Sequence, residues 1–311
     1  MPNLPWLKTA VAAAAAAAVF FGVTGGSASE TPAPAPVAVA PIGQEDPGGQ
    51  AEAPAPSDPA ADHWAVIIGI NKYMGSTRNL DGSVGDAKVL YRMLRDHGWK
   101  KRNIKLVLNY DATASEITKS LRWLANNTTK RSTVIFHYAG HEMPFYGDVE
   151  GDGEHRDVAL WATDNRYILD GQLGWLLGKV KAKRMWVHIA ACRAGGFDDR
   201  GTIKKGRVVT YSSPEGQLSY EDPSRKHSVF GLFVLRKGMK SGEADLNGNG
   251  KVSVQSAFRY SENRVRHYTS HRQHPTIVDR MDGAFRLDIP KPKKQQKDEP
   301  EPGCLLGICP P

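Results

Sequence analysis

The sequence predicts an α/β domain of three layers, in which helices flank a mostly parallel central sheet of about six strands. Short apolar runs alternate along the chain with segments whose apolar residues recur at helical spacing, and this alternation is typical of crossover units. The chain has 311 residues, of which 40% are hydrophobic and 24% charged. That length and composition are sufficient for a sizeable buried core.

The apolar runs give the strands. The first, residues 63–70, ends at Gly69-Ile70-Asn71 and is typical of a buried strand that leads into a loop. Its continuous apolar character favours a strand covered on both faces. The predicted strands are residues 63–70, 104–108, 133–138, 184–191, 207–212 and 276–279.

The intervening segments give the helices. Residues 83–97 place Ala87, Leu90 and Leu94 on one face, and Gly98 ends the pattern. Thr113 and Glu116 form a capping box that starts the next helix. Further helices are predicted over residues 172–180, 228–240 and 253–268. Helices placed between strands in this way connect parallel neighbours.

The two ends of the chain differ from its middle. Lys8, an apolar run and the small residues Gly26-Ser27-Ala28 predict a signal peptide over residues 1–28, and hence a secreted or periplasmic protein. An uncleaved anchor is the alternative, but the run falls short of the ~20 residues that a spanning helix needs. Residues 29–61 are dominated by Pro, Ala, Gly and acids and predict a disordered Pro/Ala-rich spacer, and residues 290–311 predict a disordered tail. One folded domain is therefore expected over residues 62–289, with no membrane span after cleavage.

The three cysteines fall into two groups. Cys304 and Cys309 lie close together in the tail and are able to pair in an oxidising compartment. Cys192 is then the odd thiol, which is either reactive or a small apolar core residue. The net charge of +8 is spread among acids, and no nucleic-acid motif accompanies it, so we expect a solvated basic surface and no nucleic-acid partner.

Two reactive side chains follow two of the predicted strands. His141 comes after the strand at residues 133–138, and Cys192 ends the strand at residues 184–191. Active-site loops gather at the carboxyl ends of parallel strands, so neighbouring strands would bring the imidazole and the thiol together. A nearby histidine lowers the pKa of a thiol or accepts its proton. The backbone N–H groups of Cys192 and of residue 142 are candidates for an oxyanion site. The separation of 51 residues (192 − 141) and the sequence Ala191-Cys192-Arg193 resemble the caspase signature.

Over residues 63–289 the chain resembles the caspase-like cysteine peptidases of peptidase family C14, in particular their bacterial metacaspase type. The resemblance implies a caspase-like fold and a cysteine endopeptidase that needs no cofactor and acts on proteins or peptides. His141 would be the base and Cys192 the nucleophile. The segments that carry the resemblance are AVIIGINKY, Gly85-Asp86-Ala87, HYAGH, GDVEGDGEHRDVALWATD, MWVHIAACRAGG, RVVTYSSPEGQLSYED, HSVFGLFVL and ADLNGNGKVS.

Two residues depart from the family pattern. Glu142 stands where the family usually has Gly, and Ala190 stands where it usually has an acid that helps to bind a basic P1 side chain. Asp86 matches a second acid of that pocket. These three positions are the candidate substrate-binding residues, and they favour cleavage after basic residues only weakly. The alternative is a catalytically silent binding or scaffold module of the same fold.

One loop resembles a calcium site. Asp245, Asn247, Asn249 and Gly250 stand at positions 1, 3, 5 and 6 of an EF-hand-type pattern, but Ser256 replaces the bidentate Glu at position 12. Possible Ca²⁺ binding there competes with a tight Asn/Gly turn before the next helix. A second acidic stretch, which contains Asp148, Glu150, Asp152, Glu154 and Asp157, follows His141 and is either a solvated loop or part of a calcium-responsive site.

Overall fold

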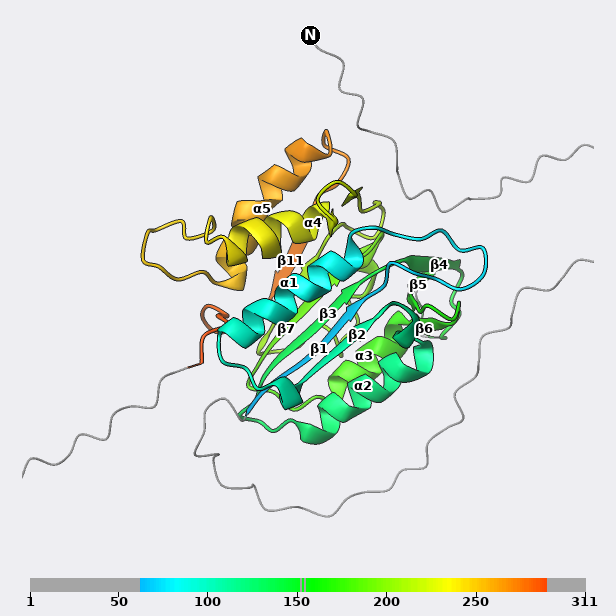
Figure 1. The fold of residues 1–311 in the computed structure, drawn as a ribbon. Coiled ribbons are helices and arrows are strands. Elements are labelled where there is room, and N and C mark those ends of the chain that lie inside the picture. Colours follow the sequence, from blue (N-terminus) through cyan, green and yellow to red (C-terminus); the bar gives the residue numbers. More distant parts are fainter. Residues whose placement is uncertain (1–61, 152, 154, 290–311) are drawn as a thin grey trace, which may run out of the picture.

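The computed structural model describes residues 62–151, 153 and 155–289, whose centre is a six-stranded sheet (Figure 1). The strand order is β11-β8-β7-β3-β1-β2, and β11 alone runs antiparallel to its neighbour within this sheet. The predicted strands and the mostly parallel α/β sheet are confirmed. The strands are β1 His63–Gly69, β2 Ile104–Leu108, β3 Thr133–Ala139, β7 Arg184–Ala190, β8 Arg207–Tyr211 and β11 Thr276–Asp279.

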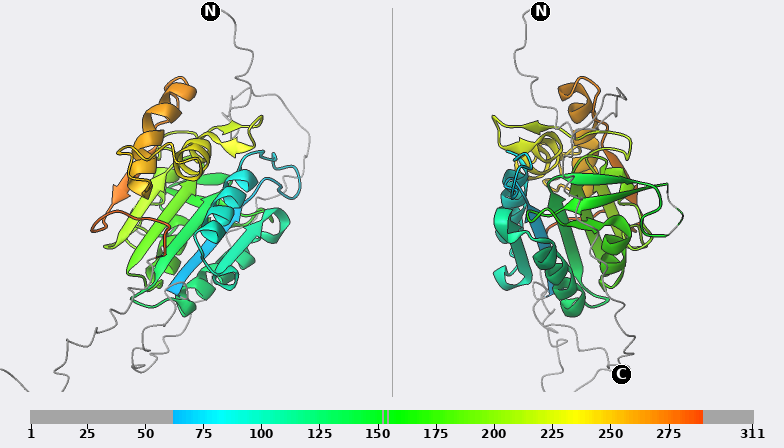
Figure 2. Two further views of the ribbon diagram at one scale, coloured as in Figure 1. Left: turned by 60° about the vertical axis from the view of Figure 1, so that its left-hand side comes forward. Right: turned by 90° about the vertical axis from the view of Figure 1, so that its right-hand side faces the viewer.

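Helices cover both faces of the sheet and bury its alternating side chains (Figure 2). Along β1, Val66 and Ile68 pack against α2 and α3, whereas Ala65 and Ile67 pack against α1 and α5. Because successive residues of a strand point to opposite faces, one apolar run supplies two cores. The helices are α1 Ser83–Asp96, α2 Ala114–Asn127, α3 Asp170–Gly178, α4 Val229–Gly231 and α5 Val254–Tyr268, with a π-helical segment, η5, at Leu232–Lys240.

The connection from β3 to β7 contains a second, antiparallel sheet that the sequence did not predict. Its strand order is β4-β5-β6, and Pro144 lies in its edge strand β4. A two-stranded hairpin, β9 with β10, precedes α4. Their bounds are β4 Glu142–Tyr146, β5 Arg156–Trp161, β6 Tyr167–Leu169, β9 Glu221–Asp222 and β10 His227–Ser228, and short 3₁₀ turns occur at Lys101–Asn103, Asn109–Asp111 and Ala194–Gly196.

Several expectations concern the ends of the chain. The predicted signal peptide, the spacer and the cysteine pair of the tail lie outside the described residues and remain predictions. None of the helices in the described part of the chain has the length and apolar character that crossing a bilayer requires.

The pairing of β3 with β7 determines where the candidate site lies. The pairs run from Thr133 opposite Arg184 to Ala139 opposite Ala190. Paired residues are therefore 51 positions apart (190 − 139), which is also the separation of His141 and Cys192. The two reactive residues thus stand at matching steps, just beyond the carboxyl ends of adjacent parallel strands.

Candidate active site

His141 leaves β3 with its ring held in one orientation. Its Nε2 lies 2.7 Å from the carbonyl oxygen of Arg78, which can only accept a hydrogen bond. The Nε2 proton therefore points at Arg78, and Nδ1 carries the free lone pair when the ring is neutral. Burial lowers the pKa of His141, and the positive charge of Arg78 also lowers it, against the hydrogen bond to the Arg78 carbonyl, which raises it. A neutral imidazole with a free Nδ1 is suited to accept a proton.

Cys192 leaves β7 and contacts the segment before β9. The Ser219 N–H donates to Sγ over 3.4 Å, and the thiol lies 3.8 Å from the Ser219 carbonyl oxygen. Burial is the main cause that raises the pKa of the Cys192 thiol to about 11; the charge of Glu142 adds to the rise, and the Ser219 backbone and Arg193 oppose it. The sulfur is thus a thiol at neutral pH in this arrangement, and its activation needs a base that takes the proton.

The backbone N–H of Cys192 is available for an oxyanion. The next N–H, that of Arg193, donates to Gln217, and the preceding one, that of Ala191, donates to Ser212. Within the described part of the chain, no acceptor is hydrogen-bonded to the Cys192 N–H. Arg193 itself adopts a left-handed backbone conformation, with φ of 48°, which turns the chain sharply after Cys192.

Glu142 forms a buried ion pair with Arg193, the residue after Cys192. Glu142 Oε2 lies 3.1 Å from Arg193 Nη1, and the Glu142 side chain has no exposed surface. Burial raises the pKa of Glu142 to about 7, although Arg193 lowers it. Its other oxygen, Oε1, has no hydrogen-bond partner. The ion pair therefore joins the residues that follow the two reactive side chains.

Ala190 and Asp86, the other two candidate substrate-binding residues, are both buried. Ala190 is buried opposite Ala139, so its methyl group forms part of the core. Asp86 is fully buried at the start of α1, where His227 Nδ1 lies 2.7 Å from Oδ1 and the Ser228 hydroxyl donates to Oδ2. Burial raises the pKa of Asp86, and these hydrogen bonds lower it.

Glu221 is an acid of this region that the sequence analysis missed. Its two carboxylate oxygens accept from the N–H groups of Asp81 and Gly82, each over 2.9 Å. Its negative charge acts on the Cys192 thiol and on Asp86. Glu221 lies in the segment RVVTYSSPEGQLSYED. Its partner Gly82 lies 139 positions earlier in the chain (221 − 82), so only the fold reveals the contact.

A different group of acids forms the best candidate for a cation site. Carboxylate oxygens of Glu150, Asp157 and Asp170 lie within 4.8 Å of one another, and we call these residues the acidic cluster. Asp157 and Asp170 are buried, and each has an Oδ1 atom without a hydrogen-bond partner. Burial raises the pKa of Asp170 to about 8, with Glu150 and Asp199 raising it further. Buried, unpaired carboxylate oxygens fit a hard cation such as Ca²⁺.

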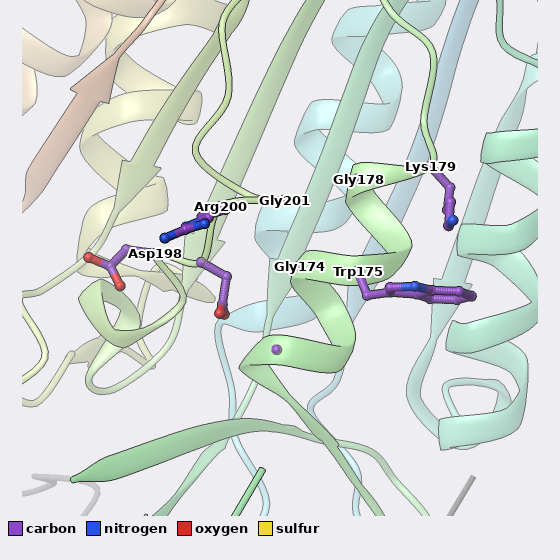
Figure 3. A pocket seen from close by; sticks show the side chains of 9 residues that line it. Gly174, Trp175, Gly178, Lys179, Asp198, Arg200 and Gly201 are labelled. Atoms are coloured by element: carbon purple, nitrogen blue, oxygen red, sulfur yellow. The ribbon is translucent and has the colours of Figure 1, made fainter. Parts of the chain in front are cut away.

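The acidic cluster adjoins a cavity of about 660 Å³ beside α3, which Figure 3 shows from close by. Gly171 follows Asp170 directly, and a Cβ atom there would lie 2.7 Å from a Glu150 carboxylate oxygen. Glycine at this position thus lets the acid approach the start of α3. The cavity is lined by Gly171, Gly174, Trp175, Gly178, Lys179, Asp198, Asp199, Arg200 and Gly201.

The side-chain oxygens of the EF-hand-like loop accept hydrogen bonds from the loop's own backbone N–H groups. Asp245 accepts from the N–H groups of Asn249 and Gly250, and Asn249 accepts from Lys251. Ser256, at position 12 of the pattern, exchanges hydrogen bonds with Ser253 in the cap of α5. This arrangement is that of a tight turn that starts a helix.

Comparison with known proteins gives a consistent set of similarities. The caspase-domain model of peptidase family C14 matches residues 62–285. Metacaspase-1 of Lodderomyces elongisporus is 24% identical over 218 residues, and metacaspase-3 of Arabidopsis thaliana is 30% identical over 156 residues. The alignments cover 62% and 46% of this chain but only 47% and 42% of those proteins, so the chain spans less than half the length of these curated relatives.

Two solved structures share the fold. A protein from Geobacter sulfurreducens aligns with a TM-score of 0.54 at 16% identity, covering 71% of this chain and 94% of that one. Caspase-1 of Spodoptera frugiperda aligns with a TM-score of 0.50 at 15% identity, covering 73% of this chain and 90% of that one. At these identities the likeness concerns the arrangement of helices and strands.

Proposed function

Because this chain belongs to the caspase-domain family, peptidase C14, we propose that it is a cysteine endopeptidase with His141 and Cys192 as its catalytic dyad. The observation that carries the proposal is the register of β3 and β7, whose last pair, Ala139 with Ala190, precedes His141 and Cys192 by two positions on each strand. Its substrates would be proteins or peptides, and no cofactor takes part in the bond cleavage.

The contacts of the two residues suggest the order of events. Substrate binding would displace Ser219 from Sγ, and His141 Nδ1 would accept the thiol proton as sulfur attacks the peptide carbonyl. The Cys192 N–H would stabilise the oxyanion. The protonated imidazole would then donate its proton to the leaving amine, which leaves an acyl-enzyme. Water, deprotonated by the same imidazole, would hydrolyse that thioester and restore the thiol.

A preference for Arg or Lys at P1 is the finer part of the proposal. Asp86 and Glu221 place two acids beside the start of α1, and the charge of Glu221 acts on the thiol. A cationic P1 side chain would be attracted to this region. Ala190 contributes no charge, so the attraction rests on these two acids.

The acidic cluster supports a proposed calcium site, in preference to the loop at Asp245, Asn247 and Asn249. Glu150, Asp157 and Asp170 would hold the ion, and its charge would offset the repulsion among their carboxylates. The cation would thereby stabilise the junction of β5 with α3.

We also propose that the protein is exported, because residues 1–28 have the pattern of a signal peptide.

The test combines labelling with turnover. A peptidyl acyloxymethyl ketone ending in Arg should label the wild-type protein, and Cys192→Ala and His141→Ala should abolish the labelling. Fluorogenic peptides ending in Arg, Lys, Asp and Ala then report P1 preference. Equal turnover of all four would refute the basic preference, and turnover that survives in Cys192→Ala would refute the dyad.

A silent binding module is the second candidate, and the state of Cys192 favours it. A thiol with a pKa of about 11 that contacts the Ser219 backbone is unreactive as it stands. Absence of Cys192-dependent labelling, both with and without Ca²⁺, would favour the silent binding module over the active peptidase.

A further inference from the structure

The main chain of His141 is held by hydrogen bonds to two tyrosine hydroxyls. Its N–H donates to the Tyr73 hydroxyl over 2.7 Å, and the Tyr138 hydroxyl donates to its carbonyl over 2.6 Å. The two tyrosines thus engage both polar groups of the His141 backbone. We call this pair, Tyr73 and Tyr138, the tyrosine clasp.

Both tyrosines of the clasp are buried and stay protonated. Tyr73 is 4% exposed and Tyr138 is fully buried. Burial raises the pKa of each phenol above its ordinary value. The hydroxyls are therefore uncharged at neutral pH. Loss of the Tyr73 hydroxyl would leave the His141 N–H without its acceptor, whereas the His141 carbonyl would keep the Trp161 N–H after loss of the Tyr138 hydroxyl. Such a loss costs about 1–3 kcal/mol in a buried site.

The residue before the histidine provides the room for the clasp. A Cβ atom at Gly140 would lie 2.7 Å from the Tyr138 hydroxyl oxygen and 2.8 Å from that of Tyr73. Any larger residue would push the two hydroxyls away from the His141 backbone. The glycine is needed here for close approach, since its backbone conformation is open to other residues.

The loop between β1 and α1 holds both the backbone and the ring of His141. Tyr73 accepts from its N–H and packs its own ring 4.7 Å from the imidazole, while Arg78 accepts from Nε2. The Tyr73 N–H donates to Asn79, which fixes the loop upon itself. Three contacts from one short loop thus determine both where the imidazole lies and which nitrogen carries the proton.

We propose that Tyr73 and Tyr138 are positioning residues, which keep Nδ1 of His141 at the place from which it takes the Cys192 proton. This inference rests on the proposed peptidase activity. The clasp touches neither the thiol nor the substrate in this proposal, and it acts through the histidine alone. A misplacement of about 1 Å can cost a reaction about 100-fold, so a clasp of this kind is expected to affect turnover more than binding.

Single hydroxyl deletions test the clasp by kinetics. Tyr73→Phe should lower kcat at least tenfold while KM changes less than twofold, and it should shift the acid limb of the pH profile of kcat/KM. Tyr138→Phe should have a smaller effect, because the Trp161 N–H still donates to the His141 carbonyl. Tyr260→Phe is the matched control, because it removes a hydroxyl of α5 that donates to Glu243 in a partly buried contact. It should lose stability but keep kcat.

Selective ¹⁵N-histidine labelling gives a readout that does not need activity. In Tyr73→Phe the NMR signal of the His141 amide should shift to a value typical of a weakly hydrogen-bonded N–H. The imidazole should titrate at a different pH from wild type. Unchanged His141 signals, or a kcat equal to that of Tyr260→Phe, would overturn the clasp. A wild-type protein without Cys192-dependent turnover would refute the proposed function instead, and the labelling would still decide on the clasp.

Discussion

Glu142 and Arg193, the residues that follow His141 and Cys192, form an ion pair across the ends of β3 and β7. They are 51 positions apart (193 − 142), so the register that aligns His141 with Cys192 aligns their neighbours as well. The carboxylate stands where the family usually has glycine, and its negative charge raises the pKa of the Cys192 thiol. The ion pair thus joins the two loops, and its Glu142 carboxylate opposes formation of the thiolate while its Arg193 guanidinium favours it.

Glu142→Gln should therefore make Cys192 more reactive above neutral pH. The pKa of Glu142 is about 7, so the wild-type carboxylate is charged above that pH and neutral below it. We expect iodoacetamide to alkylate the variant roughly threefold to tenfold faster at pH 8, and equally fast at pH 6, because one pKa unit changes the thiolate fraction tenfold. Glu215→Gln, which removes an exposed ion pair with Arg156, is the control. A constant ratio of rates across this pH range would contradict the expectation.

Acidification should destabilise the protein through two stacked histidines. His137 on β3 faces His188 on β7 with ring centroids 5.1 Å apart, and both are fully buried. Burial lowers the pKa of His137 to about 3 and that of His188 well below its ordinary value. The unfolded chain binds protons at these rings below about pH 6.5 and the folded chain does not. Stability is thus full above pH 6.5 and falls on acidification, by up to about 1.4 kcal/mol per pH unit for each ring.

Urea denaturation between pH 7.5 and 5 measures this dependence. The unfolding free energy of His137→Leu should fall less steeply with decreasing pH than that of wild type, because one titrating ring is gone. The exposed His271→Gln should follow the wild-type curve. Parallel curves for all three proteins would show that the buried pair does not cause the acid sensitivity.

Gly140→Ala should disrupt the tyrosine clasp without touching a hydroxyl. The added methyl would lie under 3 Å from both phenol oxygens, so the clasp must open. Overpacking of this kind typically costs about 1–3 kcal/mol, and we expect turnover to fall with it. Gly216→Ala is the matched control, because a Cβ atom there meets no atom within 4 Å. Thermal unfolding and kcat, measured on both variants, check the difference.

Calcium should stabilise the protein through the acidic cluster. At a free Ca²⁺ concentration 100 times Kd, a site present only in the folded state adds about 2.7 kcal/mol. Asp170→Asn should abolish the rise in Tm, whereas Asp245→Asn should retain it. Because the pKa of Asp170 is about 8, affinity should weaken as pH falls below that value. A rise that depends on Asp245 and not on Asp170 would place the ion in the EF-hand-like loop.

The sequence predicted the central sheet well, because its signals are local. Continuous apolar runs identified β1, β3 and β7, and a capping box located the start of α2, where Thr113 accepts from the Glu116 N–H. The antiparallel strands β4–β6 were missed because β4 contains Pro144 and an acidic stretch separates β4 from β5. Their stability comes from pairing with each other, which no local pattern reports.

The candidate site could be predicted only where a residue type carries the chemistry. The side chains of His141 and Cys192 mark them as candidates, and their catalytic role stays a prediction. The carbonyl of Arg78 and the backbone of Ser219 do not, because every residue has these groups and only the fold selects them. Tyr73 lay within the quoted segment AVIIGINKY, but its role depends on a contact made 68 positions later along the chain.

The register of β3 and β7 has a consequence for how such proteins diversify. The two strands place His141 and Cys192, while everything between Ala139 and Arg184, including the β4–β6 sheet and α3, is an excursion that leaves the sheet and returns to it. The separation of 51 residues (192 − 141) is set by the length of that excursion together with strand β7, and it is not a requirement of the chemistry. Evolution, or an engineer who inserts a sensor domain at an exposed turn such as Gly151, can therefore lengthen it without moving the catalyst.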